Sequence, residues 1–380
     1  MIDPLLMIPG PTNLPSEVVR AMARPAISHR AGEFHMLFED TTEKIRKVFN
    51  TNSDVFILTA SGTGGVECAL VNTVSKGDKI IIPVYGEFSR RGKAIAEKSG
   101  AKCIVKEYPP GYGLTYEDAK KLIDENQDAK VIFLVYNDTS PGVEIRELDK
   151  ICRYAKSKGL ITIVDAISIA GGDYLKIDDW KIDMCVIGTQ KCLASPPGIS
   201  IITVSQDAWQ TISEKTCPSF YFDLKLYKRF SQKKETPFTP AIHLLYALNE
   251  GLSLILSQGV EEWIKRHYKN RSAIACAFTS MGFTEYVKEP FRSTTVLSFT
   301  CPSGVTPGEL VSKLYEKTRI LVARGLGELK EKIIRVGNMG ITSLREVLEL
   351  TAAVAYILSE YGERFDLNKI IENVHKIYES

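Results

Sequence analysis

Short apolar runs, many of them rich in β-branched residues, alternate with amphipathic stretches from about residue 55 to residue 204. Such runs predict buried strands, and apolar positions at helical spacing predict helices that pack on a sheet. The predicted helices include Gly86–Ser99, Tyr116–Asn126 and Ile145–Lys158. The alternation indicates an α/β fold with a mainly parallel, seven-stranded sheet covered on both faces. The predicted strands are Val55–Thr59, Lys79–Val84, Ala101–Val105, Val131–Val135, Leu160–Val164, Ile182–Ile187 and Ile199–Val204.

The pattern changes after about Pro240. A long helical run, Ala241 to Gln258, continues past Gly259 into Glu261–Met281, and fewer strands follow it. One of the two closing helices begins with Ser343-Leu344-Arg345-Glu346, a capping box. A chain of 380 residues is too long for one hydrophobic core. We therefore expect an N-terminal segment, 1–15, a large domain, 16–259, and a smaller C-terminal α+β domain, 260–380.

Charge and cysteine content argue against several classes of protein. The net charge of +2, without a long run of either sign, gives no support for a nucleic-acid or membrane surface. The N-terminus lacks the features of a signal peptide, and no apolar run approaches the roughly 18–20 residues of a membrane span. The 8 cysteines are scattered, so we expect neither a disulfide framework nor a metal site, and a cytoplasmic location.

A lysine follows the strand Ile182–Ile187, in the segment Gly188-Thr189-Gln190-Lys191 that leads to a Pro-Gly turn. The carboxyl ends of strands are where open α/β sheets bind their ligands. A partly desolvated lysine there can lose its proton and form a Schiff base with a carbonyl group. The alternative for Lys191 is an ordinary surface lysine.

The strand Val55–Thr59 ends in small residues, Ala60-Ser61-Gly62-Thr63-Gly64-Gly65, before a predicted helix over Cys68–Val74. Free N–H groups at a helix N-terminus, with the hydroxyls of Ser61 and Thr63, can bind an anion. A tight turn with a Ser or Thr cap is the alternative. Glu67 stands where a dinucleotide fingerprint needs its third glycine, and no P-loop lysine follows. A phosphate without the rest of a dinucleotide fits better.

An aspartate, Asp165, closes the strand Leu160–Val164. A buried acid needs a cation or several donors, so Asp165 could pair with a protonated ring nitrogen, although a helix cap or a metal ligand is an alternative. An anion loop, a strand-end aspartate and a strand-end lysine are the set that pyridoxal phosphate requires. Thr139, in the turn Asn137–Gly142, is a candidate donor to the ring oxygen, and an ordinary Asx/Pro-Gly turn is the alternative. Phe88 could supply a face for ring stacking, and a plain core phenylalanine is the alternative.

With these residues in place, the chain resembles the class V pyridoxal-phosphate aminotransferases, in the serine–pyruvate/alanine–glyoxylate aminotransferase branch. The resemblance runs from Pro9-Gly10-Pro11 to beyond Arg335-Val336-Gly337. It implies the fold of type I pyridoxal-phosphate transferases, a homodimer with active sites at the subunit interface, and small amino-acid and 2-oxo-acid substrates.

The same resemblance implies a role for each matched residue. Lys191 would bind the cofactor aldehyde and catalyse proton transfer, and Asp165 would pair with the pyridinium nitrogen. Arg335 would bind the substrate carboxylate, and Gly10 would lie near the substrate. The implied cofactor-binding residues are Ser61, Gly62, Thr63 and Gln190 at the phosphate, Phe88, Thr139 and Ile167 around the ring, and Thr239 at the phosphate of the other subunit.

Two positions depart from the pattern of the family. Thr63 stands where several members have histidine, and Pro141 replaces the usual threonine of its turn. His29 and Arg30 form another candidate anion site, and a structural loop is the alternative there.

The predicted reaction is transfer of the amino group of serine or alanine to pyruvate or glyoxylate. Aspartate, phosphoserine, aminoethylphosphonate and ureidoglycine are alternative donors in nearby branches. A cysteine desulfurase is disfavoured because that branch resembles Ser-x-His-Lys, whereas Gln190 precedes Lys191 here. Two other functions compete with the transaminase: a nucleotide-dependent dehydrogenase and a scaffold that has lost its cofactor.

Overall fold

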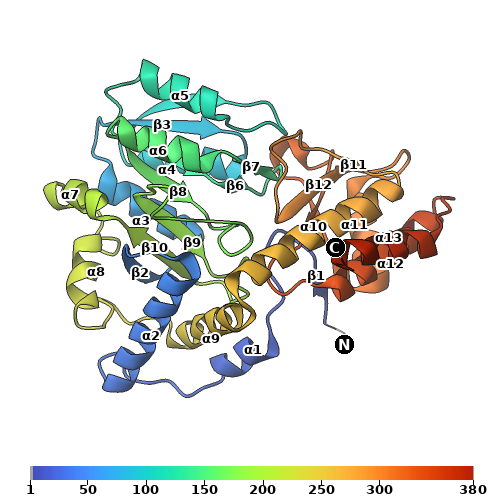
Figure 1. Ribbon diagram of the computed structural model, residues 1–380, viewed down its shortest axis with the longest axis horizontal. Helices are drawn as coiled ribbons and strands as arrows, with labels where there is room; N and C mark the ends of the chain where they lie inside the picture. The colour runs from blue at the N-terminus through green and yellow to red at the C-terminus, as the bar shows by residue number, and fades with distance from the viewer. Residues whose placement is uncertain (1–2, 380) are drawn as a thin grey trace.

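A seven-stranded sheet forms the centre of the larger part of the protein, in a computed structural model that describes residues 3–379 (Figure 1). The strand order is β2-β10-β9-β8-β5-β3-β4, and only β10 runs antiparallel to its neighbours. The carboxyl ends of the six parallel strands therefore share one edge. The strands are β2 (Asp54–Thr59), β3 (Lys79–Val84), β4 (Lys102–Glu107), β5 (Val131–Val135), β8 (Ile161–Asp165), β9 (Met184–Gly188) and β10 (Ile199–Val204).

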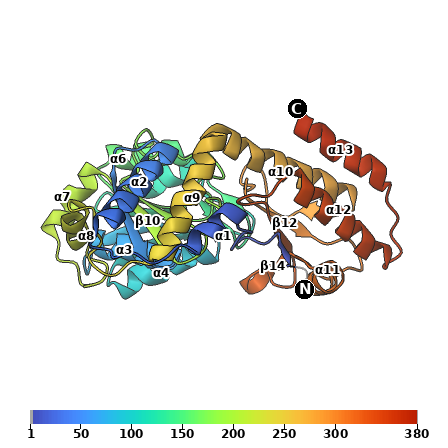
Figure 2. The same cartoon turned by 90° about the horizontal axis from the view of Figure 1, so that it is seen from below.

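Helices cover this sheet on both faces, with α4 and α6 on opposite sides in Figure 2. Helices α3 and α4 pack against each other and on the central strands, while α6 packs on β8 and on α5. On the same sheet, α2 packs on β2 and on α9. The helices are α1 (Ser16–Met22), α2 (Gly32–Phe49), α3 (Gly62–Thr73), α4 (Glu87–Lys98), α5 (Tyr116–Glu125), α6 (Leu148–Ser157), α7 (Gln206–Glu214), α8 (Leu224–Ser231) and α9 (Ile242–Gln258).

The predicted α/β fold is confirmed, since each of the predicted strands is present within two residues of its bounds. The largest difference at the carboxyl end of a strand is in β4, which ends at Glu107 rather than Val105. Two helix starts were wrong. Helix α3 begins at Gly62 rather than Cys68, because the Ser61 hydroxyl caps it by accepting from Gly64 N at 3.4 Å. Helix α6 begins at Leu148 rather than Ile145, because Ile145 N is bonded to the Tyr136 carbonyl at 2.9 Å.

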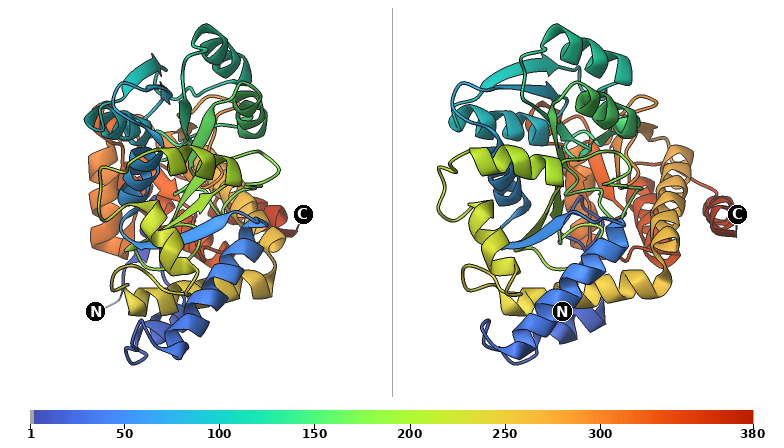
Figure 3. Two further views of the ribbon diagram at one scale, coloured as in Figure 1. Left: turned by 90° about the vertical axis from the view of Figure 1, so that its left-hand side faces the viewer. Right: turned by 60° about the vertical axis from the view of Figure 1, so that its left-hand side comes forward.

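A smaller, four-stranded antiparallel sheet, in the order β11-β12-β15-β14, follows in the chain. It carries its own cluster of buried side chains, in which Phe278 and Phe299 stack with their centroids 4.9 Å apart. In Figure 3, left, these orange and red elements lie behind the larger sheet. The elements are α10 (Val260–Ser280), β11 (Thr284–Glu285), β12 (Val296–Thr300), α11 (Pro307–Thr318), β13 (Ile320–Leu321), β14 (Ala323–Arg324), η1 (Gly327–Leu329), β15 (Ile334–Gly337), α12 (Leu344–Ser359) and α13 (Leu367–Glu379).

The N-terminal segment packs with this second sheet rather than with the first. Strand β1 (Leu5–Leu6) pairs in parallel with β13, and Met7 is fully buried in the second core. The predicted division near residue 259 stays a prediction, and the turn from α9 to α10 at Gly259, with φ of 88°, supports it. Residues 1, 2 and 380, at the outer ends of the predicted segments, lie outside the described residues.

The helices of residues 3–379 are each too short or too polar to span a membrane. The same range contains no group of three or more His, Cys, Asp or Glu side chains placed to bind a metal ion.

The contact between α3 and the sheet gives a stability prediction. A methyl group at Gly65 would overlap Ser200 Oγ and lie 2.7 Å from Val186 Cγ1. We expect Gly65→Ala to lower the free energy of unfolding by about 1–3 kcal/mol, through overpacking, in urea unfolding. The control is Gly32→Ala, where no atom lies within 4 Å of the added methyl group. Equal stabilities of the two variants would contradict the close packing.

Candidate active site

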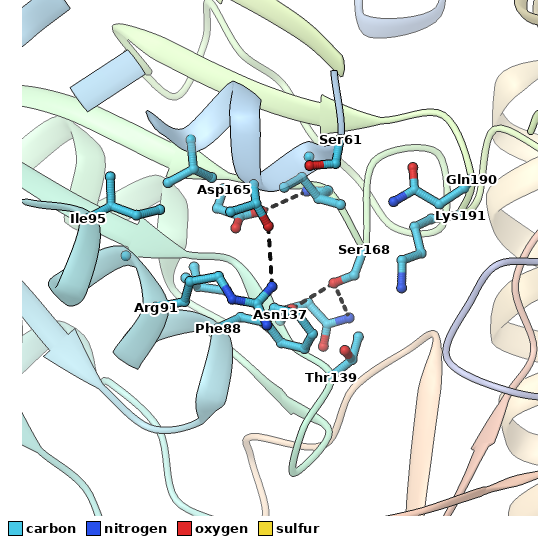
Figure 4. Close-up of a pocket in the computed structure, with 16 residues that line it drawn as sticks. Ser61, Phe88, Arg91, Ile95, Asn137, Thr139, Asp165, Ser168, Gln190 and Lys191 are labelled. Carbon is cyan, nitrogen blue, oxygen red and sulfur yellow. Dashed lines mark hydrogen bonds between the residues drawn. The ribbon is translucent and has the colours of Figure 1, made fainter. Parts of the chain in front are cut away.

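A cavity lies at the edge of the large sheet where β5, β8 and β9 end and α3 and α4 begin (Figure 4). Parallel strands bring their carboxyl ends together, so segments far apart in sequence meet there. Arg335, Gly10 and Thr239 do not line it. The predicted residues that do line it are Ser61, Gly62, Thr63, Phe88, Thr139, Asp165, Ile167, Gln190 and Lys191.

Lys191 follows β9 and is half-buried, on the opposite side of the cavity from Asp165 in Figure 4. Burial lowers the pKa of its amine to about 8, and the positive charge of Arg335 acts in the same direction. Its Nζ donates to the Pro9 carbonyl. An amine with this pKa is partly unprotonated near neutral pH, which an ordinary lysine is not.

Gly10 touches Lys191 although it does not line the cavity. A Cβ atom at position 10 would lie 2.6 Å from Lys191 Nζ, and the φ angle of +103° already disfavours any other residue. The N-terminal segment therefore reaches the cavity through a glycine that leaves room for the lysine side chain.

Asp165 is buried, with 8% of its surface exposed, at the end of β8. Burial raises the pKa of its carboxyl to about 7, and the donor Ile167 N, 3.0 Å from Oδ1, opposes that rise. No cation of the described chain lies within ion-pair distance of it. A protonated nitrogen in the cavity would therefore stabilise its charged form.

The N-terminus of α3 opens on the same cavity. Gly62 packs so closely on Ile167 that a Cβ atom would lie 2.6 Å from Ile167 Cδ1. Gln190 Oε1 and Asn137 Oδ1 are buried without a hydrogen-bond partner in residues 3–379. Unpaired buried polar atoms are costly. The helix end suits an anionic group of a ligand, whereas these two amide oxygens would need hydrogen-bond donors.

Arg335 lies on β15 and is buried, with 6% of its surface exposed. Its Nη1 donates to the Thr139 carbonyl at 2.9 Å and its Nε to the Arg324 carbonyl at 2.8 Å. Burial lowers its pKa to about 10, so it remains charged at neutral pH. In the described part of the chain no carboxylate lies within 4.0 Å of it. A buried cation held only by carbonyl groups is suited to an anionic substrate group.

Three predicted residues lie elsewhere. Thr239 is exposed before α9, and its predicted contact with another subunit stays a prediction. Arg30 bonds to Glu235 at 2.8 Å and to the Thr236 carbonyl at 2.7 Å, and His29 makes an edge contact with Phe34. Arg30 is thus bonded to the loop before α9, and the candidate anion site at His29 and Arg30 stays a prediction.

Three polar residues that the sequence analysis did not single out also line the cavity: Arg91, Asn137 and Ser168. Arg91 lies one helical turn after Phe88, with its Cζ 4.9 Å from that ring, and donates to Thr63 Oγ1 at 3.2 Å. Asn137 Nδ2 donates to Ser168 Oγ at 3.0 Å. The spacing of three residues from Phe88 was the available signal for Arg91.

The chain is similar to known aminotransferases over most of its length. The model of the family "Aminotransferase class-V" matches residues 5–335. An uncharacterized aminotransferase of Methanocaldococcus jannaschii is 40% identical over 95% of this chain and 94% of its own length. The serine–glyoxylate aminotransferase of Methylorubrum extorquens is 32% identical over 92% of this chain and 89% of its own. The crystal structure of ureidoglycine–glyoxylate aminotransferase from Bacillus subtilis has a TM-score of 0.95 at 28% identity, covering 100% of this chain and 99% of that one.

The lowered pKa of Lys191 gives a pH prediction. Only the unprotonated amine reacts with acetic anhydride, so labelling of Lys191 in protein freed of bound small molecules should be half-maximal near pH 8. In urea the midpoint should move up toward the ordinary lysine value of about 10.4. Mass spectrometry of the peptide that contains Lys191 measures both midpoints, and equal midpoints would contradict burial as the cause.

Proposed function

The chain belongs to the class V aminotransferases, whose cofactor is pyridoxal phosphate, and we propose that it transfers the amino group of serine or alanine to glyoxylate or pyruvate. The observation that carries the proposal is that one cavity is lined by Lys191, whose pKa is lowered, and by Asp165, which has no cation within residues 3–379. Arg335, which has no acid partner in the same range, is bonded to the carbonyl of Thr139, another residue of that lining. Proton transfer requires an amine that can lose its proton, a protonated ring nitrogen requires an acid beside it, and a substrate carboxylate requires a cation.

The residues of the cavity fit the cofactor. Ser61, Gly62 and Thr63, at the N-terminus of α3, would hold the phosphate together with Gln190, whose side-chain amide can donate through its NH2 group. Asp165 would pair with a protonated ring nitrogen, which would supply the cation that this carboxylate lacks. Phe88 and Ile167 would lie against the ring, and Thr139 would lie beside the ring oxygen. Lys191 would lie at the aldehyde, and all four residues line the cavity. When bound, the cofactor supplies a ring that accepts the electrons left by a departing Cα proton.

Two residues would act on the substrate. Arg335 would bind the α-carboxylate of the donor and fix its orientation, because a guanidinium fork matches a carboxylate. Lys191 Nζ, partly unprotonated near neutral pH because of its lowered pKa, would accept the proton from the donor Cα. Gly10, packed on the lysine stem, would leave that amine free to move.

The charges around the cavity favour a donor with a neutral side chain. Of the cations that line it in the described chain, Lys191 is the proposed base, and Arg91 lies across the cavity beside Thr63 (Figure 4). Arg335 is assigned to the α-carboxylate. An aspartate or phosphoserine side chain would need a further cation near Lys191. The similarity to a serine–glyoxylate aminotransferase supports the same choice.

We also propose a homodimer in which Thr239 reaches the phosphate site of the partner subunit. Thr239 is exposed, and the loop before it is fixed by the bonds from Arg30 to Glu235 and to the Thr236 carbonyl. An exposed hydroxyl on an already ordered loop can bind a group of another subunit with little further loss of conformational entropy.

A panel of amino donors tests the substrate proposal. With glyoxylate or pyruvate as acceptor, we expect serine and alanine to give at least about tenfold higher kcat/KM than aspartate or phosphoserine, because an unpaired second acid costs more than about 1.4 kcal/mol. Product 2-oxo acid is measured for each donor. A preference for aspartate would overturn the donor assignment while leaving the transaminase class intact, and sulfide release from cysteine would favour the desulfurase alternative.

Substitution of Arg335 tests its role. We expect Arg335→Gln to raise the KM of the amino donor about 10- to 100-fold, because the charged hydrogen bonds to the carboxylate are lost. The control is Arg324→Gln on the adjacent strand, whose side chain pairs with Glu331 at the surface. Steady-state kinetics at saturating cofactor measure both variants. Equal KM values for the two variants would show that Arg335 does not bind the donor carboxylate.

A further inference from the structure

Asp138 carries a fully buried carboxylate just outside the cavity. It ends β6 (Asn137–Asp138), which pairs with β7 (Val143–Glu144) in a hairpin after β5. On the premise of the proposed function, we propose that Asp138 is a positioning residue, which holds Phe88 at the cofactor ring and the Thr139 carbonyl at Arg335.

The carboxylate of Asp138 caps α4 from outside that helix. Its Oδ2 accepts from Phe88 N at 3.0 Å, Ser89 N at 2.9 Å and Ser89 Oγ at 3.0 Å. The N-cap residue of α4 is Gly86, which has no side chain of its own to do this. A Cβ atom at Gly86 would overlap the carboxylate, so the glycine lets Asp138 approach. An anion at a helix N-terminus is stabilised by the free N–H groups and by the helix dipole.

The other oxygen of Asp138 orders its own turn. Oδ1 accepts from Ser140 Oγ at 2.6 Å and from Ser140 N at 3.2 Å. The Ser140 hydroxyl in turn accepts from Glu87 N at 2.7 Å. The first three N–H groups of α4 are therefore all bound to the Asp138 carboxylate, two of them directly and one through the Ser140 hydroxyl. This fixes the backbone of Phe88, whose ring lines the cavity.

Thr139 lies between Asp138 and Ser140, so the same turn also fixes the group that anchors Arg335. The Thr139 side chain lines the cavity, and its carbonyl accepts from Arg335 Nη1 at 2.9 Å. The negative charge of Asp138 also opposes the burial that lowers the pKa of Arg335. One turn thus connects Phe88, on helix α4, with Arg335, on the small sheet.

A second buried aspartate offers a matched control. Asp183 is 2% exposed and accepts from Lys156 Nζ at 2.6 Å, Thr162 N at 3.0 Å and Ser205 Oγ at 2.9 Å. It precedes β9 at the amino end of the strand, away from the cavity. Replacement of either aspartate by asparagine removes one buried charge and disturbs a comparable set of hydrogen bonds. Only one of the two sets reaches residues at the cavity.

The experiment compares Asp138→Asn with Asp183→Asn. We expect both variants to melt at lower temperature, because both lose charge-assisted hydrogen bonds. Only Asp138→Asn should raise the Kd of the apoprotein for pyridoxal phosphate, by about tenfold or more, in a titration followed by visible absorbance and circular dichroism, because the stacking residue is no longer fixed. At saturating cofactor it should also raise the KM of the amino donor more than it lowers kcat.

Ser140→Ala serves as a milder variant if Asp138→Asn fails to fold. It keeps the carboxylate but removes the hydroxyl between Asp138 and Glu87 N, so a smaller change of Kd in the same direction is expected. Wild-type Kd and KM in both Asp138→Asn and Ser140→Ala, with a loss of melting temperature like that of Asp183→Asn, would overturn the proposal. If the wild-type protein transaminates none of the proposed donors while Asp138→Asn still loses cofactor affinity, the proposed function fails and the positioning role stands.

Discussion

Four ionisable side chains are buried or half-buried at one edge of the sheet without an oppositely charged group of the described chain at ion-pair distance: Lys191, Asp165, Arg335 and Asp138. Isolated buried charges are costly, and a folded protein ordinarily avoids them. Three of the four have a pKa moved toward the neutral form by burial. The fourth, Asp138, is satisfied by the N-terminus of a helix. The ring nitrogen of bound pyridoxal phosphate and the carboxylate of a bound substrate would supply the charges that Asp165 and Arg335 lack. Part of the cost of burying these two groups in the free protein would then be recovered on binding.

The topology of the large sheet makes this edge. Its parallel strands end together, and β10 alone runs back, so the turn from β9 to β10 carries Lys191 across the edge and returns the chain to the sheet. Asp165 projects from the neighbouring strand β8. The segments after β2 and β3, where α3 and α4 begin, bring the proposed phosphate-binding turn Ser61–Thr63 and Phe88 to the same cavity.

The second sheet and the N-terminal segment complete the site. Strand β1 pairs with β13, which places Gly10 against Lys191, and β15 holds Arg335 over Thr139. These contacts join segments more than 170 residues apart in the chain. They bring Arg335, the proposed substrate-binding cation, and Lys191, the proposed base, to one site only when both sheets are packed.

The sequence by itself determined the strands, the turn of small residues after the first of them, and the positions of Lys191 and Asp165 at strand ends. These follow from local periodicity and from the rule that parallel strands share their carboxyl edge, and neither needs long-range packing. Only the tertiary structure decided that Asp138 caps a helix that begins 51 residues before it, that Arg91 faces the cavity, and that Arg30 binds a loop. Those outcomes depend on which segments pack together and on which polar groups then lack partners, and a one-dimensional pattern of residues does not contain that information.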